Sequence, residues 1–96
     1  MKLESKVQAQ ILRDIKAHGV RVVFKVTPVN YTGAADIFFI HADTGPVFVE
    51  VKKVDGEARK LQLKRQQDAI AAGAKAYVCH GIEEWVLIRK EIWSKL

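Results

Sequence analysis

The stretch Val47-Phe48-Val49-Glu50-Val51-Lys52 alternates between valines and a second set that ends in two charges. Strand side chains point alternately to the two faces of a sheet, so the pattern predicts a β-strand with one apolar face. Glu50 and Lys52 then share the other face, roughly 6 to 7 Å apart along the strand. A carboxylate can hold a hard divalent cation, and an ammonium beside it can orient or activate a water. An isolated Glu-x-Lys pattern is more often an ion pair on a solvated face, so a metal site needs support from other residues.

The segment before this strand predicts a hairpin that brings a second carboxylate to the same face. Asp36 opens a predicted strand over Ile37–His41, and a three-residue loop over 43–45, with its glycine in the left-handed conformation, leads back. This register places Asp36 opposite Lys52 and on a diagonal of about 7 Å from Glu50. One bridging cation can span that distance. A loop one residue longer or shorter would turn Asp36 to the other face.

Hydrophobic periodicity and glycine or proline boundaries predict the remaining elements. Helices are expected over 3–18, 61–72 and 82–95, and further strands over 20–27 and 75–80, although the run 85–88 can also be read as a short strand. Glu4 and Gln8 lie one turn apart beside the apolar stripe of the first helix, so both can point along the edge of a sheet that the helix covers. An acid favoured by the helix dipole is the other interpretation of Glu4.

Composition and length set broad bounds on the class of protein. Ninety-six residues with 49% hydrophobic and 28% charged residues are typical of one globular domain, expected over 1–96. No apolar run approaches the roughly 18 residues that cross a bilayer, and the first residues lack a signal-peptide core, so we expect a cytoplasmic protein with no membrane partner. Cys79 is the only cysteine, which excludes an internal disulfide or a thiolate zinc cluster.

The charge balance favours a polyanionic partner. Sixteen Lys and Arg against eleven Asp and Glu give a formal charge of +5. Six of the cations fall within fourteen residues and predict a phosphate-facing patch: Lys52, Lys53, Arg59, Lys60, Lys64 and Arg65. Tyr31 can stack on a base or cap the core. Gln62 or Gln66 can bond a metal-bound water or a phosphate, or both can be solvated.

The order of these motifs resembles the PD-(D/E)xK nuclease superfamily and, more narrowly, the VRR-NUC family, over residues 3 to about 80. The matching positions are Glu4 with Gln8, Gly33-Ala34-Ala35-Asp36, Phe48-Val49-Glu50-Val51-Lys52, Leu61-Gln62 and Gly73. Ala35 departs from the pattern, since the family usually has a proline there that presets the start of the strand. The resemblance implies an α/β, restriction-endonuclease-like α-β-β-β-α-β core with a mixed sheet, followed here by a C-terminal helix.

The resemblance also implies an activity and roles for the matched residues. The activity is hydrolysis of DNA phosphodiesters with Mg²⁺ or Mn²⁺, and stand-alone members are linked to phages and to homodimeric cleavage of branched DNA such as Holliday junctions. Asp36, Glu50 and the Val51 carbonyl would bind the ion, with Glu4 reaching it directly or through water. Lys52 would orient or help deprotonate the attacking water, and Gln62 is a better candidate than Gln66 for the contribution of the second helix. The other cations would grip the DNA backbone without reading sequence.

The C-terminal segment carries more large apolar groups than one buried stripe needs, including Trp85 and Trp93. We therefore expect a homodimer that covers some of them, the other interpretation being that both tryptophans cap the core of the monomer.

Two other functions fit parts of the pattern. One is a non-catalytic DNA-binding or structure-recognition module of the same fold, and the other is a protein-interaction domain whose charges are solvated.

Overall fold

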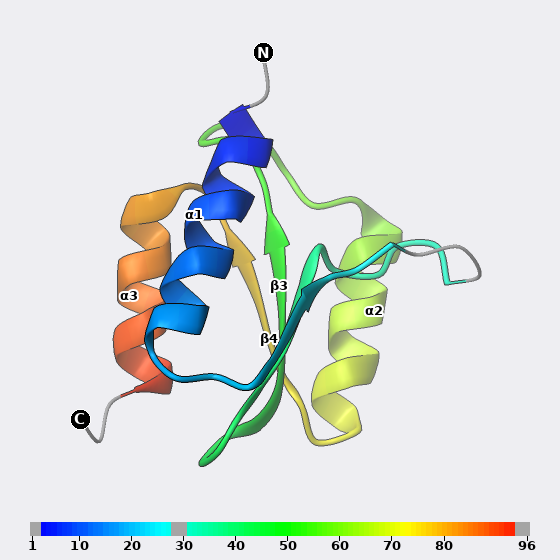
Figure 1. Cartoon of the computed structure of the whole chain (residues 1–96). Coiled ribbons are helices and arrows are strands. Elements are labelled where there is room, and N and C mark those ends of the chain that lie inside the picture. The colour runs from blue at the N-terminus through cyan, green and yellow to red at the C-terminus, as the bar shows by residue number, and fades with distance from the viewer. Residues whose placement is uncertain (1–2, 28–30, 94–96) are drawn as a thin grey trace.

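A computed structural model describes residues 3–27 and 31–93, which form three helices and one four-stranded sheet (Figure 1). The elements are α1 (Leu3–Ala17), β1 (Val22–Lys25), β2 (Ile37–His41), β3 (Gly45–Val51), α2 (Lys60–Ala71), β4 (Lys75–Cys79) and α3 (Ile82–Ile92). Strand order is β1-β2-β3-β4, antiparallel except for the parallel pair β3 and β4. The predicted α-β-β-β-α-β order with a final helix is confirmed. The strand interpretation of 85–88 is wrong, because these residues lie within α3.

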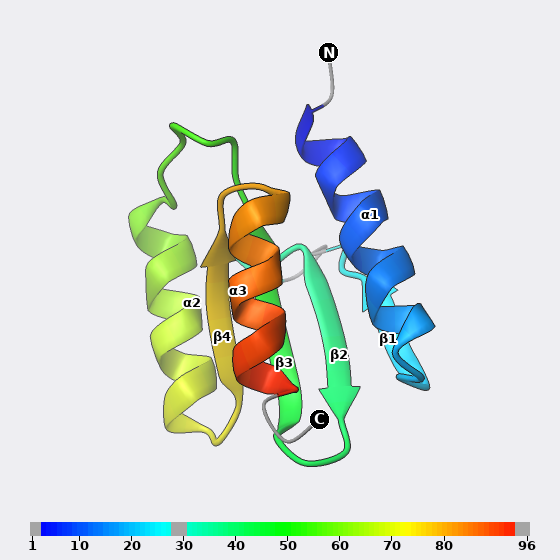
Figure 2. The ribbon, with the colours of Figure 1, turned by 90° about the vertical axis from the view of Figure 1, so that its left-hand side faces the viewer.

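Helices cover the two faces of the sheet unequally. α1 and α3 lie on one face and contact each other, whereas α2 lies on the other face and packs on β4 (Figures 1 and 2). The core lies between the sheet and the α1–α3 layer. Its fully buried members include Ile11 and Ile15 of α1, Phe39 of β2 and Trp85 of α3. No helix within the described ranges is long and apolar enough to cross a membrane.

The alternation in the quoted stretch is confirmed. Val47, Val49 and Val51 are buried in the core under α1 and α3. Glu50 and Lys52 therefore point to the α2 side of the sheet, as side chains of alternate strand residues must. β3 also lies between β2 and β4, so this strand and the residue directly after it carry both the centre of the core and the charged pair.

The predicted hairpin register is wrong by two residues. Gly45 has the expected left-handed backbone, with φ of +80°, but it is the first residue of β3 and pairs with His41. The loop is instead 42–44, and the His41 ring holds it by accepting hydrogen bonds from the backbone N–H groups of Asp43 and Thr44 at 3.1 and 3.3 Å. Because a shift of two preserves the face of every side chain, Asp36 still lies on the face of Glu50.

The two tryptophans both pack against other residues of the chain, Trp85 completely and Trp93 in part. Trp85 is fully buried and donates a hydrogen bond from Nε1 to Asp14 Oδ2 at 2.7 Å. Trp93 stacks on Phe39 with ring centroids 5.8 Å apart. Both tryptophans thus lock α3 onto the core. Residues 94–95, the end of the predicted helix, lie outside the described residues.

Candidate active site

Asp36 and Glu50 meet at one end of the sheet, where β2 begins and β3 ends. The β2–β3 register pairs Ile37 with Val49, so the next position places Asp36 opposite Glu50 rather than opposite Lys52. Asp36 Oδ2 accepts a hydrogen bond from the Val51 N–H at 2.8 Å, which fixes the carboxylate against the neighbouring strand. This contact orients Asp36 without the proline that the VRR-NUC pattern has at position 35.

Glu50 is the most deeply buried of the charged groups at this end, with only 2% of its surface exposed. Its Oε2 accepts a hydrogen bond from Gln62 Nε2 at 2.7 Å and lies 3.4 Å from Lys52 Nζ. Its Oε1 is also buried, and within the described part of the chain it has no hydrogen-bond partner. An unpaired buried carboxylate oxygen is costly and is a recognised sign of a missing ion or water.

The electrostatics of this pair favour a bound cation. Burial, and after it the nearby charge of Asp36, raise the pKa of the Glu50 carboxyl from its ordinary 4.5 to about 7, against the lowering effect of Lys52. Burial also raises the pKa of Asp36, against the lowering effects of the Val51 N–H and Lys52. The charge of Glu4, at the start of α1, also raises the pKa of both carboxyls, by a smaller amount. A divalent cation would relieve this repulsion.

The donor set fits a hard cation only if groups other than side chains complete it. Among residues 3–27 and 31–93, no three His, Cys, Asp or Glu side chains gather closely enough to hold a metal. Asp36 and Glu50 therefore supply two carboxylates, and backbone oxygen and water would supply the rest. Oxygen ligands of this kind, with several waters retained, suit Mg²⁺.

Two solved structures share this arrangement of elements over most of their length. One, described as "VRR_NUC domain", superposes with a TM-score of 0.76 at 26% sequence identity, over 90% of this chain and 94% of that chain. The other, described as "VRR_NUC domain protein", has a TM-score of 0.80 at 17% identity, over 96% of this chain and 88% of that chain. The chain has the VRR-NUC fold. No protein-family profile and no curated protein matches its sequence. The VRR-NUC fold is a nuclease-family fold, which generally implies DNA as the substrate and a divalent metal.

The second helix of the VRR-NUC fold contributes Gln62, and not Gln66, to this end of the sheet. Gln62 Oε1 accepts a hydrogen bond from the Arg59 N–H at 2.8 Å, which orients its Nε2 group toward Glu50. Gln66 instead donates to the Tyr77 carbonyl of β4 at 3.0 Å. Gln62 thereby ties the start of α2 to the end of β3.

The predicted basic residues lie along α2 and the segment before it, in two groups. Lys53, Arg59 and Lys60 are exposed, and within the described ranges none of them forms a salt bridge. Asp55 and Glu57 on the same segment partly offset their charge. A second group has intramolecular partners, because Lys64 Nζ lies 2.9 Å from an Asp68 carboxylate oxygen and Arg65 Nε donates to the Thr32 carbonyl at 2.9 Å. The Arg65 guanidinium also lies 3.9 Å above the centroid of the exposed Tyr31 ring, so this ring already has a cation on one face.

The sequence interpretation missed two residues near this end of the sheet. Lys25, the last residue of β1, lowers the pKa of Asp36 through its charge, and the Val26 N–H donates to the Asp36 carbonyl at 2.8 Å. Pairing β1 with β2 from the sequence would have brought Lys25 beside Asp36. His80 follows β4 and its Nε2 lies 3.0 Å from the Gly56 carbonyl oxygen. No spacing signal connects positions 56 and 80, so only the folded chain reveals this contact.

Proposed function

We propose that this chain is a metal-dependent DNA endonuclease, acting as one domain over 1–96. The unpaired, buried Oε1 of Glu50 beside Asp36 carries the proposal. Both carboxyls have raised pKa values, and burial is the main cause. Burying two carboxylates side by side is unfavourable, and a bound cation would offset the repulsion between them in a way that water cannot.

The residues around the pair suit phosphodiester hydrolysis. Asp36, Glu50 and the Val51 carbonyl would hold Mg²⁺ or Mn²⁺, with Glu4 acting through water because three acidic side chains do not gather here. When bound, the ion would polarise the phosphate and lower the pKa of a water. Lys52 would position the attacking water and stabilise charge on the phosphate oxygens.

Two groups of residues support this centre from α2 and the segment before it. Gln62 fixes the Glu50 carboxylate in place by its 2.7 Å hydrogen bond. Lys53, Arg59, Lys60, Lys64 and Arg65 would contact the DNA backbone without reading sequence, and Tyr31, which precedes β2, would stack on a base. We further propose that the enzyme selects branched DNA such as four-way junctions and cuts it as a homodimer. A twofold dimer presents two sites, and paired cuts in a symmetric junction require two.

Cleavage assays with matched variants test this function. The wild-type chain should cut supercoiled, linear or four-way-junction DNA with Mn²⁺ and lose all cutting with chelator. Asp36→Ala, Glu50→Ala and Lys52→Ala should each lower the cleavage rate by about a hundredfold or more, the usual loss for a group that acts on the reacting proton or water. Lys75→Ala is the control, because Lys75 pairs with Val47 at the other end of β3.

Asp36→Asn separates loss of a metal ligand from loss of the fold. The asparagine keeps an oxygen that can accept the Val51 N–H, so this variant should remain as stable as the wild-type chain while losing activity. Wild-type turnover in Lys52→Ala would exclude the role given to Lys52. DNA binding without cleavage under any of these conditions would instead establish a non-catalytic DNA-binding module.

A further inference from the structure

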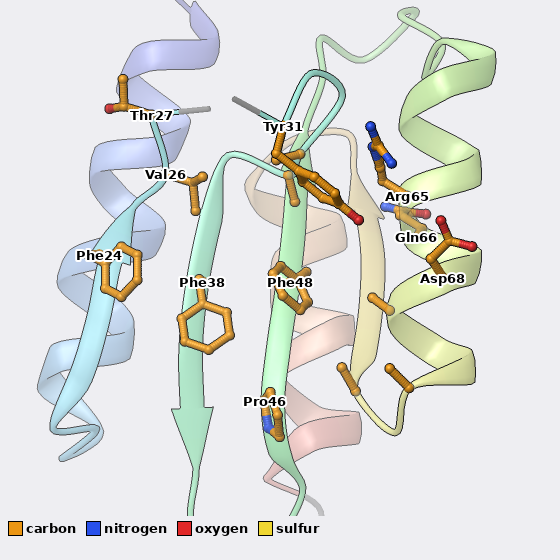
Figure 3. Close-up of a pocket in the computed structure, with 15 residues that line it drawn as sticks. Phe24, Val26, Thr27, Tyr31, Phe38, Pro46, Phe48, Arg65, Gln66 and Asp68 are labelled. Carbon is orange, nitrogen blue, oxygen red and sulfur yellow. The ribbon is translucent and has the colours of Figure 1, made fainter. Parts of the chain in front are cut away.

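The face of the sheet that carries Asp36 and Glu50 also carries a row of aromatic rings. Phe24, Phe38 and Phe48 lie directly opposite one another on β1, β2 and β3, so their side chains point to the same face. Successive ring centroids lie 5.4 and 4.9 Å apart. We refer to these three residues as the phenylalanine row (Figure 3).

The phenylalanine row is open to solvent. Helix α2 packs mainly on β4, and the row lines a groove of about 1060 Å³ between the sheet and this helix. Phe24 is 51% exposed, whereas Phe38 and Phe48 are half-buried. Sites for small molecules usually have volumes of roughly 300–1,000 Å³, so the groove has room for at least one nucleotide.

Tyr31 extends the aromatic surface toward the candidate active site. In Figure 3 Tyr31 lies beside Arg65, between Phe48 and the end of β3 that carries Glu50. Its ring is 49% exposed, and the Arg65 guanidinium lies 3.9 Å from the ring centroid on one side. Four aromatic side chains therefore line one groove that begins beside the two carboxylates.

The chemistry of the groove fits nucleobases better than phosphates. Bases stack on aromatic side chains whatever their sequence, because every base has a π-face. Arg65 and Asp68 are the charged residues that line the groove, and both are already bonded within the chain. A ligand would therefore meet rings here rather than free charges. The exposed cations Lys53, Arg59 and Lys60 lie outside the groove, where they can contact phosphates.

We propose that the phenylalanine row, continued by Tyr31, is a stacking subsite for unpaired bases of the DNA substrate. Phe38 and Phe48 lie two residues along their strands from Asp36 and Glu50, which is about 7 Å, and on the same face. Nucleotides of one stacked strand rise roughly 3.4 Å each. A base on the row would therefore belong to a nucleotide about two steps from the scissile phosphate.

This subsite rests on the proposed nuclease function and deepens it, since it names the feature of the DNA that the enzyme selects. Bases inside a duplex are stacked on their neighbours and paired, so they cannot lie on a protein ring. Leaving the stack costs least for a base that is already unpaired. The enzyme would therefore prefer to cut beside unpaired bases rather than within continuous duplex.

Binding to single-stranded DNA in chelator tests the subsite independently of cleavage. Fluorescence anisotropy would compare a single-stranded oligothymidine, a strand of the same length that lacks bases, and a duplex of that length. The wild-type chain should bind the oligothymidine more tightly than the base-free strand, although the two carry the same phosphates. This comparison needs no variant, so it holds whatever a substitution does to folding.

Substitutions in the row assign the stacking to a residue. Phe24→Leu should weaken binding to the oligothymidine by about tenfold, the usual loss on removing one stacking ring, and should leave binding to the duplex unchanged. Phe24→Tyr keeps a ring and should keep the wild-type affinity. Ile40→Ala is the control, because Ile40 is 44% exposed two residues from Phe38 on the same face but does not line the groove. Circular dichroism should show that all three variants fold.

Several results would overturn the subsite. These are equal wild-type affinities for the oligothymidine and the base-free strand, an unchanged affinity in Phe24→Leu, and equal losses in Phe24→Leu and Ile40→Ala. If Phe24→Leu lowers the sedimentation mass of the chain but not its affinity for single strands, the row is a contact between copies instead.

Cleavage with Mn²⁺ separates the subsite from the nuclease. A duplex with unpaired nucleotides beside the cut should be cleaved faster than a continuous duplex, and Phe24→Leu should remove this preference. Base-dependent binding without any cleavage would keep the subsite and reject the nuclease. Cleavage without base-dependent binding would keep the nuclease and reject the subsite.

Discussion

Burying Glu50 carries a cost that depends on pH. The pKa of its carboxyl is about 7 in the folded chain, above the ordinary value of 4.5, because burial disfavours the charged form. The protonated carboxyl therefore favours the folded state fully below about pH 4.5, and this contribution is lost as the pH rises through 7. A shift of this size corresponds to about 3 kcal/mol in the free energy of unfolding at alkaline pH, as an upper bound.

Glu50→Gln should remove this pH dependence, since glutamine is a neutral isostere of the protonated acid. In chelator, the variant and the wild-type chain should have similar free energies of unfolding at about pH 4, and the variant should become more stable by up to about 3 kcal/mol at about pH 9. Urea unfolding at both pH values measures the difference. Parallel pH profiles for the two proteins would contradict the raised pKa of Glu50.

Metal provides the second part of the same experiment. Mg²⁺ or Mn²⁺ binds the ionised carboxylate, so it should stabilise the wild-type chain more at about pH 9 than at about pH 5. Glu50→Gln should gain little from the metal at either pH. A variant stabilised as much as the wild-type chain would show that the ion binds elsewhere.

At the scale of elements, His80 connects the β4–α3 junction to the segment that follows Lys52. Its Nε2 lies 3.0 Å from the Gly56 carbonyl oxygen, and Glu84 Oε1 accepts from the His80 backbone N–H at 2.8 Å and contacts Nδ1 at 3.0 Å. Gly56 in turn donates to the Lys53 carbonyl. The segment 53–59 thus leads from the end of β3 to the start of α2, and the contact between Gly56 and His80 holds its middle in place.

His80→Ala should loosen this segment and lower cleavage without touching the reacting groups. We expect faster amide hydrogen exchange over 53–59 and roughly tenfold slower cleavage, with both effects largely restored in His80→Gln, whose amide can reach the Gly56 carbonyl. His18→Ala is the control, because His18 bonds Asp14 at the end of α1. Unchanged exchange over 53–59 in His80→Ala would reject the anchoring role.

Sequence patterns predicted some features of these elements and could not predict others. The valine alternation predicted β3 and its two faces, and Asp36 joined Glu50 despite a wrong register because the error was an even number of residues. The observed loop 42–44 bonds the His41 ring, a side-chain contact that no periodicity encodes. The apolar residues of α3 were also ambiguous, since pattern alone cannot tell whether a tryptophan meets its own core or a partner. The link from His80 to Gly56 joins positions that no spacing pattern connects, so it appears only in the folded chain. Lys25, by contrast, could have been placed beside Asp36 by pairing the first two strands.

At the scale of the whole molecule, the chain has a formal charge of +5, which favours contact with a polyanion. Lys53, Arg59 and Lys60 lie around the segment between β3 and α2, near the candidate site. Lys16 lies in the last turn of α1, about 18 Å along the helix from Glu4. Each phosphate contact releases condensed counterions, so the dependence of affinity on salt counts the cations that take part.

Alanine variants at these positions should therefore change the salt dependence of DNA binding by different amounts. In a plot of log affinity against log salt, Lys53→Ala, Arg59→Ala and Lys60→Ala should each make the slope shallower by about one. Arg65→Ala should change the slope less, because its guanidinium is already held by Thr32 and Tyr31, and Lys16→Ala should leave it unchanged. Fluorescence anisotropy on one duplex, with Ca²⁺ in place of Mg²⁺ to limit cleavage, gives the slopes. If the wild-type affinity does not change with salt, Lys53, Arg59 and Lys60 do not contact DNA phosphates. If Lys16→Ala changes the slope as much as Lys60→Ala does, binding depends on the net charge of the chain and not on these positions.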